Sequence, residues 1–175
     1  DINLMTGFII NNFDDIRGDG HLTQSGYIFQ LPHGRGNTKF FKIERNGILQ
    51  YFSYQEKVNI SETSNGLYYE RIKQQILQFL NSINYFYKET YSGRMNLHIS
   101  IKNIDLTFLL SDKASFENRC HESYELVIER EPHTEMIKKE PKKVTNFILL
   151  EFLQSFGVQI FNIELTGQRA HLFYT

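Results

Sequence analysis

The feature that most constrains this chain is a β-hairpin that can be recognised between residues 38 and 54. Asn46-Gly47 separates two runs rich in aromatic and branched side chains, residues 39–43 and 48–52. Asn-Gly favours a two-residue type I′ turn, because both turn positions need a positive φ angle. The sequence therefore predicts two antiparallel strands joined by a tight turn.

The two-residue turn also predicts the register of the hairpin. It places Phe41 opposite Phe52 and Ile43 opposite Gln50, and directly opposed side chains of this kind stabilise a sheet. Phe41, Ile43 and Phe52 then share the face that we expect to be buried. Tyr51 lies on the opposite face, which is only partly polar.

Two helices are predicted after the hairpin. Between residues 67 and 91, apolar side chains recur at spacings of three and four, which is typical of an amphipathic helix. Residues 144–156 are apolar around almost the whole helical circumference, and Gly157 is a good C′ residue to end the helix. A helix of that kind is buried in a core or at an interface. A homo-oligomer formed through this second helix is therefore one of the expected partners.

The rest of the chain adds short strands and polar loops. We expect one α+β domain over residues 1–175, with a mainly antiparallel sheet packed against two principal helices at about 67–91 and 144–156. The expected strands beyond the hairpin are 27–31, 97–101, 104–110, 124–129, 158–165 and 170–174, and the expected loops include 53–66, 112–123 and 130–143.

Composition restricts the class of protein. The net charge is −1, so no global basic field indicates nucleic acid by itself. The single cysteine, Cys120, allows no internal disulfide and favours a reducing, cytoplasmic location. No apolar run approaches the roughly 20 residues that span a bilayer, so we expect no membrane partner. The chain begins at Asp1 and not at Met, which suggests a fragment of a larger protein.

An acidic loop near the N-terminus is the candidate for metal chemistry. It contains Asp14, Asp15, Asp19 and His21. A calcium loop started at Asp15 would need a bidentate glutamate at its twelfth position, where this chain has Gly26. We interpret the loop as a solvated turn and assign no metal or other cofactor. A metal-dependent hydrolase or nuclease built on this loop remains an alternative.

A glycine-containing turn is the first candidate anion site. His33-Gly34-Arg35-Gly36 precedes Lys39, and glycines let backbone N–H groups approach a phosphate while arginine binds it through two hydrogen bonds. The segment lacks the Gly-Lys-Ser/Thr ending of a P-loop and precedes a strand. A simple surface hairpin turn is the alternative interpretation.

A second group of candidate residues follows later in the chain. Residues 138–143 read Lys-Lys-Glu-Pro-Lys-Lys, and Lys142 and Lys143 are the candidate phosphate contacts. Nearby glutamates dilute this charge, so a solvated loop is the alternative. Cys120-His121 and His133 are too few for a typical structural zinc site, and we expect a structural or surface role for them.

The order of the central segments resembles a known arrangement. The hairpin at residues 39–52, the long helix and the segment Leu97-His98-Ile99-Ser100-Ile101-Lys102-Asn103-Ile104 are similar to the region downstream of a Schlafen/AlbA_2-type domain in many bacterial multidomain proteins. The similarity covers residues 38–111. It implies an accessory domain in a nucleic-acid-related regulator or a defence protein. It transfers no catalytic or nucleotide-binding residue.

These observations favour a non-catalytic sensing or interaction module over an enzyme. Its partners would be other domains of the same polypeptide or another protein. The alternative is a nucleic-acid-binding domain that uses a small basic surface including Arg35, Lys39, Lys142 and Lys143.

Overall fold

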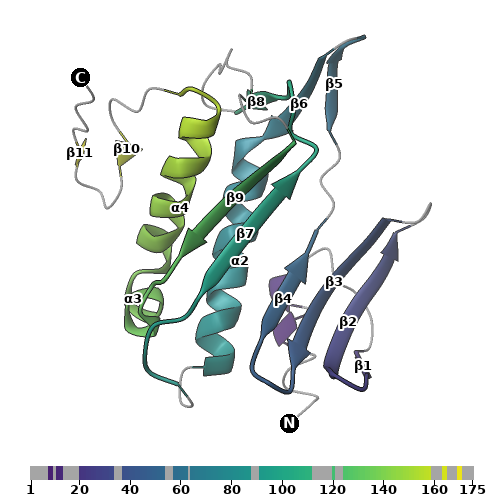
Figure 1. The fold of residues 1–175 in the computed structure, drawn as a ribbon, viewed down its shortest axis with the longest axis vertical. Coiled ribbons are helices and arrows are strands. Elements are labelled where there is room, and N and C mark those ends of the chain that lie inside the picture. Colours follow the sequence, from purple (N-terminus) through teal and green to yellow (C-terminus); the bar gives the residue numbers. More distant parts are fainter. Residues whose placement is uncertain are drawn as a thin grey trace. The chain divides into compact units, whose positions relative to one another are not determined.

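The computed structural model describes residues 8–9, 11–13, 20–33, 37–53, 57–62, 64–87, 91–111, 120, 124–158, 163–164 and 169–170. Helices and mainly antiparallel strands form an α+β protein, as the sequence predicts (Figure 1). The chain divides into two compact units, Asp1–Gln55 and Glu56–Thr175. The organisation as one domain stays a prediction. Within the described part, no helix is both long and apolar enough to cross a membrane.

The first unit contains an antiparallel sheet whose strands follow one another in chain order. β2 extends beyond the predicted end of the strand at residue 31, through Pro32, which pairs with Thr38. Its strands are β1 (His21–Leu22), β2 (Gly26–His33), β3 (Asn37–Glu44) and β4 (Leu49–Phe52).

The predicted hairpin exists, but its turn is one residue longer than predicted. The Glu44 N–H donates to the Ile48 carbonyl at 2.8 Å, and the Gly47 N–H donates to the Glu44 carbonyl at 3.0 Å. Gly47 has a φ of 84°, whereas Asn46 does not have a positive φ. This is the three-residue loop in which a glycine supplies the left-handed position. The two-residue type I′ turn is therefore wrong.

The longer turn shifts the register of the hairpin. Phe41 pairs with Tyr51, and Phe40 pairs with Phe52. Phe41 is fully buried, and the ring of Phe13 lies 5.2 Å from that of Phe41 and 5.0 Å from that of Tyr51. Phe52 is 48% exposed and stacks on Phe40 on the other face. The core position predicted for Phe52 is wrong, because one added residue exchanges the two faces of a strand.

Among its described residues, the second unit contains three small sheets. β6 and β8 pair in parallel, and β5 pairs with β6 in the region predicted as a loop at 53–66. β7 and β9 form a two-stranded antiparallel ribbon in the register of Leu97 with Arg130. The strands are β5 (Val58–Ser61), β6 (Ser64–Tyr68), β7 (Leu97–Lys102), β8 (Phe108–Leu110) and β9 (Glu125–Arg130), and a short pair is formed by β10 (Ile163–Glu164) and β11 (Arg169–Ala170).

Three described helices complete the second unit. α2 (Tyr69–Tyr87) begins directly after β6, with no loop between strand and helix. α3 (Thr134–Lys139) and the first turn of α4 (Pro141–Ser155) occupy most of the segment 130–143 that was predicted as a loop. The rest of α4 covers nearly all of the second predicted helix, 144–156. His133 caps α3 by accepting a hydrogen bond from the Glu135 N–H, and proline is favoured in the first turn of a helix. Neither the His133 cap nor the proline in the first turn of α4 was recognised from the sequence, because charged residues surround them.

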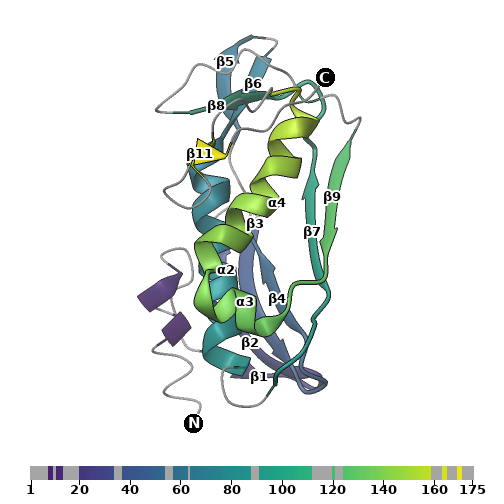
Figure 2. The ribbon, with the colours of Figure 1, turned by 90° about the vertical axis from the view of Figure 1, so that its left-hand side faces the viewer.

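The core of the second unit lies between these helices and the β7–β9 ribbon. α2 and α4 run side by side and cover one face of the ribbon, with α4 against β9 (Figures 1 and 2). Asn84 of α2 donates its side-chain N–H to the Ile137 carbonyl at 3.0 Å, which joins α2 to α3. The apolar side chains buried on the helices are Ile72, Ile76, Leu80, Ile83, Ile137, Val144, Ile148, Leu149, Phe152 and Leu153.

α4 ends before Gly157, as the sequence predicts. Gly157 has a φ of 65°, its N–H donates to the Gln154 carbonyl, and the Val158 N–H donates to the Leu153 carbonyl. This pair of hydrogen bonds is the Schellman motif. On α4, much of the apolar surface is buried within this chain, and Phe147 remains 42% exposed.

Candidate binding surfaces

The junction between α3 and α4, which we call the helix elbow (residues 138–143), contains four lysines. The Glu140 N–H ends α3 by donating to the Met136 carbonyl at 2.9 Å, and the Glu140 carbonyl accepts from Lys143 and Val144 at the start of α4. Pro141 occupies the first turn of α4, and its carbonyl accepts the Thr145 hydroxyl at 2.9 Å. The backbone of the elbow is therefore fixed by hydrogen bonds on both sides.

Carboxylates neutralise part of the charge at the helix elbow. Lys138 and Lys143 form ion pairs with Glu135 at 3.1 Å and with Glu140 at 2.9 Å. The hydrogen bond from Lys138 holds the pKa of Glu135 below its ordinary value, and the charge of Lys139 acts in the same direction. Lys142 is exposed and makes no ion pair with any residue that the structure describes.

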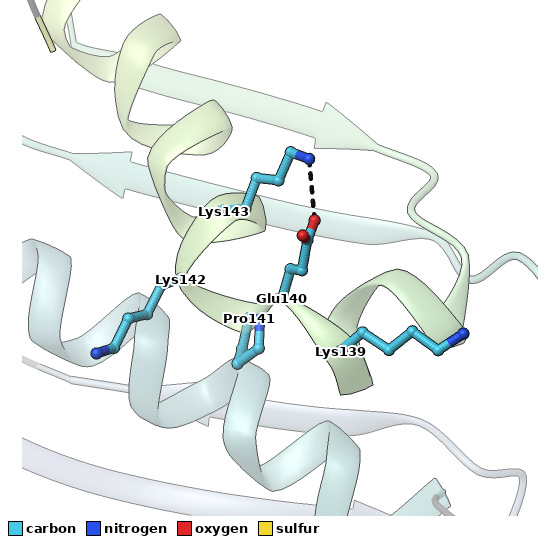
Figure 3. A pocket seen from close by; sticks show the side chains of 5 residues that line it. All are labelled: Lys139, Glu140, Pro141, Lys142 and Lys143. Carbon is cyan, nitrogen blue, oxygen red and sulfur yellow. Dashed lines mark ion pairs between the residues drawn. The ribbon is translucent and has the colours of Figure 1, made fainter. Parts of the chain in front are cut away.

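The lysines of the helix elbow do not converge on one point. A hollow of about 370 Å³ is lined by residues 139–143. Around it, Lys139 and Lys142 point in opposite directions, while Lys143 turns toward Glu140 (Figure 3). The structure thus places the predicted candidates Lys142 and Lys143 next to each other, as a spread of charge and not as a pocket for one phosphate.

The other predicted anion site is only partly described. His33 is the last residue of β2 and Lys39 lies in β3, where it pairs with Leu31. Arg35 and the side chains of His33 and Lys39 lie outside the described residues. This site stays a hypothesis, and the structure does not relate it to the helix elbow.

The candidates for metal or thiol chemistry are only partly described. His21 is exposed in β1, whereas Asp14, Asp15, Asp19 and His121 lie outside the described residues. Cys120 is buried, and its backbone N–H donates to the Thr107 carbonyl at 2.9 Å, while His133 is the cap of α3. Across the described ranges, no group of three or more histidine, cysteine and acidic residues gathers where it would hold a metal ion.

The outer face of the β7–β9 ribbon carries an ordered set of polar side chains. His98 Nδ1 lies 3.1 Å from Glu129 Oε1, and Lys102 Nζ lies 3.6 Å from Glu125 Oε1. The Ser100 hydroxyl also donates to Glu125. This hydrogen bond, followed by the attraction of Lys102, lowers the pKa of Glu125.

The sequence indicated half of this face. The alternation of Leu97, Ile99 and Ile101 with polar residues is typical of a strand, and in the structure these three are the less exposed positions of β7. The partner residues on β9 were missed, because the pairing of β7 with β9 joins segments more than twenty residues apart and depends on a register that neither segment contains.

Along the outer edge of β9, no backbone–backbone hydrogen bond forms within the described part of the chain, and the Glu129 carbonyl accepts a hydrogen bond from the Arg130 guanidinium at 2.7 Å. The Asn103 N–H donates to the Tyr124 carbonyl, and the Met95 N–H donates to the Pro132 carbonyl. In the β7–β9 register, the two residues of each pair lie directly opposite one another, just beyond the two ends of the ribbon. Hydrogen-bonded and non-hydrogen-bonded pairs alternate in an antiparallel ribbon. Ser100 opposite Val127 is therefore a non-hydrogen-bonded pair, and β9 directs the backbone groups of Glu125, Val127 and Glu129 away from β7.

Comparisons of this chain with protein families, with curated proteins and with solved structures find no match. The resemblance of residues 38–111 to the region downstream of a Schlafen/AlbA_2-type domain therefore stays a hypothesis.

Proposed function

We propose that this chain is a non-catalytic interaction module that works beside a nucleic-acid-linked domain of a regulatory or defence protein. The observation that carries the proposal is the β7–β9 ribbon. Helices cover one of its faces, and on the other face ion pairs between the two strands hold the polar side chains in place. The outer edge of β9 offers backbone hydrogen-bonding groups. Ordered polar side chains on rigid strands form a surface that a partner can meet without rearrangement.

The non-catalytic part of the proposal is tested by turnover assays. The chain is incubated with nucleoside triphosphates, single-stranded RNA or single-stranded DNA in the presence of Mg²⁺, Mn²⁺ or Zn²⁺. We expect no product above a protein-free blank. Turnover that disappears after one substitution, such as Glu129→Gln or Asp15→Asn, would show that the chain contains an active site and would overturn the proposal.

The second candidate function is binding of the nucleic-acid backbone at the helix elbow. It is supported by Lys142, which makes no ion pair with a described residue, and by the spread of lysines around the hollow (Figure 3). Phosphates repeat along a nucleic-acid strand, so distributed lysines can each contact a different phosphate. Such binding would be independent of sequence.

Binding of labelled single- and double-stranded DNA and RNA at several salt concentrations tests this second function. Each phosphate contact contributes a slope of about 0.7 to 0.9 to the dependence of log affinity on log salt. Lys142→Gln should weaken binding and lower that slope by about one contact's share. Lys73→Gln, at an exposed position of α2, is the control. Equal effects of the two substitutions, or no binding by the chain, would show that the helix elbow does not bind nucleic acid.

A further inference from the structure

We propose that the outer edge of β9 binds an extended, basic peptide segment as an added antiparallel or parallel strand. The inference rests on the proposed interaction function and names the class of partner. An edge strand offers a row of N–H and C=O groups, and peptide recognition by strand addition uses such a row for affinity. Glu125, Val127 and Glu129 direct their backbone groups toward this edge. The Glu129 carbonyl accepts a hydrogen bond from the Arg130 guanidinium, and the remaining groups of these three residues have no backbone partner in the described part of the chain.

The helix layer favours the edge of β9 over that of β7. α4 contacts β9, and Arg130 of β9 is bonded to Glu151 of α4. Phe147 precedes Glu151 by four residues and therefore lies on the same side of α4. Its side chain is 42% exposed. A strand added to β9 would place every second side chain toward α4, where Phe147 offers apolar surface that water now contacts.

The side chains beside the edge define the charge of the partner. Glu125, Val127 and Glu129 face the outer side of the ribbon, and the side chain of Glu129 is 76% exposed. Residues directly opposite one another in a sheet have adjacent side chains, and opposite charges at such positions are favourable. The partner should therefore have lysine or arginine opposite the two glutamates and an apolar residue opposite Val127. The two positions between them should be apolar.

The same charges argue against a second copy of this chain as the occupant. In a symmetric antiparallel pairing of two β9 edges centred on Val127, Glu125 of one copy would lie opposite Glu129 of the other. Like charges that face each other directly are destabilising. The chain should therefore not associate through this edge, and sedimentation at increasing concentration checks that expectation.

The test uses a fluorescent peptide with the core Lys-Val-Ile-Val-Lys, flanked by glycines and blocked at both ends. Its binding to the chain is measured by anisotropy. A matched peptide has glutamate in place of both lysines. We expect the basic peptide to bind and the acidic peptide not to bind. Failure of the basic peptide to bind, or equal binding of both, would overturn the inference without affecting the turnover result that tests the proposed function.

Two proline substitutions locate the binding edge. Val127→Pro removes an N–H that points to the outer edge of β9, whereas Ser100→Pro removes the directly opposed N–H on the edge of β7. Val127→Pro should lower the affinity for the basic peptide by about tenfold, which corresponds to the loss of one hydrogen bond. Ser100→Pro should leave that affinity unchanged. Ser100→Ala measures the separate effect of losing the Ser100–Glu125 hydrogen bond. Equal losses for the two proline variants would contradict the assignment to β9.

A charge exchange keeps the inference testable if a proline variant does not fold. Glu129→Lys changes one exposed side chain and leaves the backbone of β9 intact. It should lower the affinity for the basic peptide and bring the affinities for the basic and acidic peptides closer together, because the charge at one of the two glutamate positions has changed sign. Unchanged affinities would show that the peptide does not lie beside Glu129, and the inference would be wrong.

Discussion

Leu106 has an unusual backbone conformation for a branched, apolar residue. Its φ is 51° and its side chain is 66% exposed, in a turn closed by the hydrogen bond from the Thr107 N–H to the Ile104 carbonyl. Asn103, in the same connection, has a φ of 58°, but asparagine tolerates the left-handed region. The side chain of Leu106 gains little from burial to offset this strain.

Leu106→Asn should therefore stabilise the chain. We expect the free energy of unfolding to rise by roughly 0.5 to 1 kcal/mol, because asparagine reduces the cost of a positive φ. Urea denaturation measures the change. Leu106→Ala is the control, since it shortens the side chain and keeps the backbone penalty. An equal gain for both variants would mean that the exposed side chain, and not the backbone, is responsible.

At Glu125, a single hydroxyl group accounts for the largest part of a lowered pKa. The ordinary value is 4.5, and the hydrogen bond from Ser100 and the charge of Lys102 lower it in the folded chain. A pKa that is lower in the folded than in the unfolded state stabilises the fold above about pH 4.5, and this contribution disappears as the pH falls through the folded pKa.

Ser100→Ala should raise the pKa of Glu125 toward its ordinary value. Carboxyl chemical shifts followed by NMR during an acid titration measure it. Glu135 provides the internal control, because its pKa is lowered by Lys138 on α3 and should not move. If the pKa of Glu125 were unchanged by the substitution, the hydroxyl would not be the main cause of the shift.

At the scale of elements, the β7–β9 ribbon makes a prediction that depends on its register. The amide protons of Leu97, Ile99 and Ile101 on β7 and of Leu126 and Ile128 on β9 should be protected from exchange with solvent. The amides of the residues between them should exchange quickly, since they point away from the partner strand.

Hydrogen exchange followed by NMR resolves these amides one by one. Protection that alternates along both strands supports the register and the free edge of β9. Equal protection of Ser100 and Val127 with their neighbours would show that both edges are covered in solution.

Local sequence predicted the elements better than their connections. The alternation in Leu97–Lys102 and the glycine after α4 are short-range signals, and the structure confirms both. The turn at Asn46-Gly47 was mispredicted because Asn-Gly also fits a loop in which only the glycine needs a positive φ. α3 was missed because its six residues are too few for an apolar period to stand out among charged side chains.

The binding surfaces depend on information that is not local. Lys142 and Lys143 were found because they are neighbours in the sequence. Glu125 and Glu129 were not found, because their relation to His98 and Lys102 exists only after β7 and β9 pair. A sequence pattern shows which residues share one strand face, but not which strand lies beside it.

At the scale of the whole molecule, the two compact units differ in the size of their cores. Among the described residues, the buried apolar side chains of the first unit are Ile9, Phe13, Phe29 and Phe41, whereas all the others lie in the second unit. We expect the first unit to unfold at a lower urea concentration, because stability grows with the apolar surface that is buried.

Two probes test this difference. Cys120 is buried in the second unit, so its reactivity toward a thiol reagent reports unfolding there. The chain has no tryptophan, and Phe52→Trp at an exposed position of β4 provides a fluorescence signal in the first unit. We expect two transitions. Coincident transitions would show one cooperative domain, as the sequence analysis predicts.

The direct passage from β6 into α2 restricts changes in chain length at one point. Tyr68 ends the strand and Tyr69 begins the helix, so no loop can absorb an inserted residue. One additional residue would rotate the helix by about 100°, and Ile72, Ile76 and Leu80 would turn out of the core. A chain with an insertion or deletion at this junction should therefore not fold, whereas substitutions of either tyrosine can leave the fold intact.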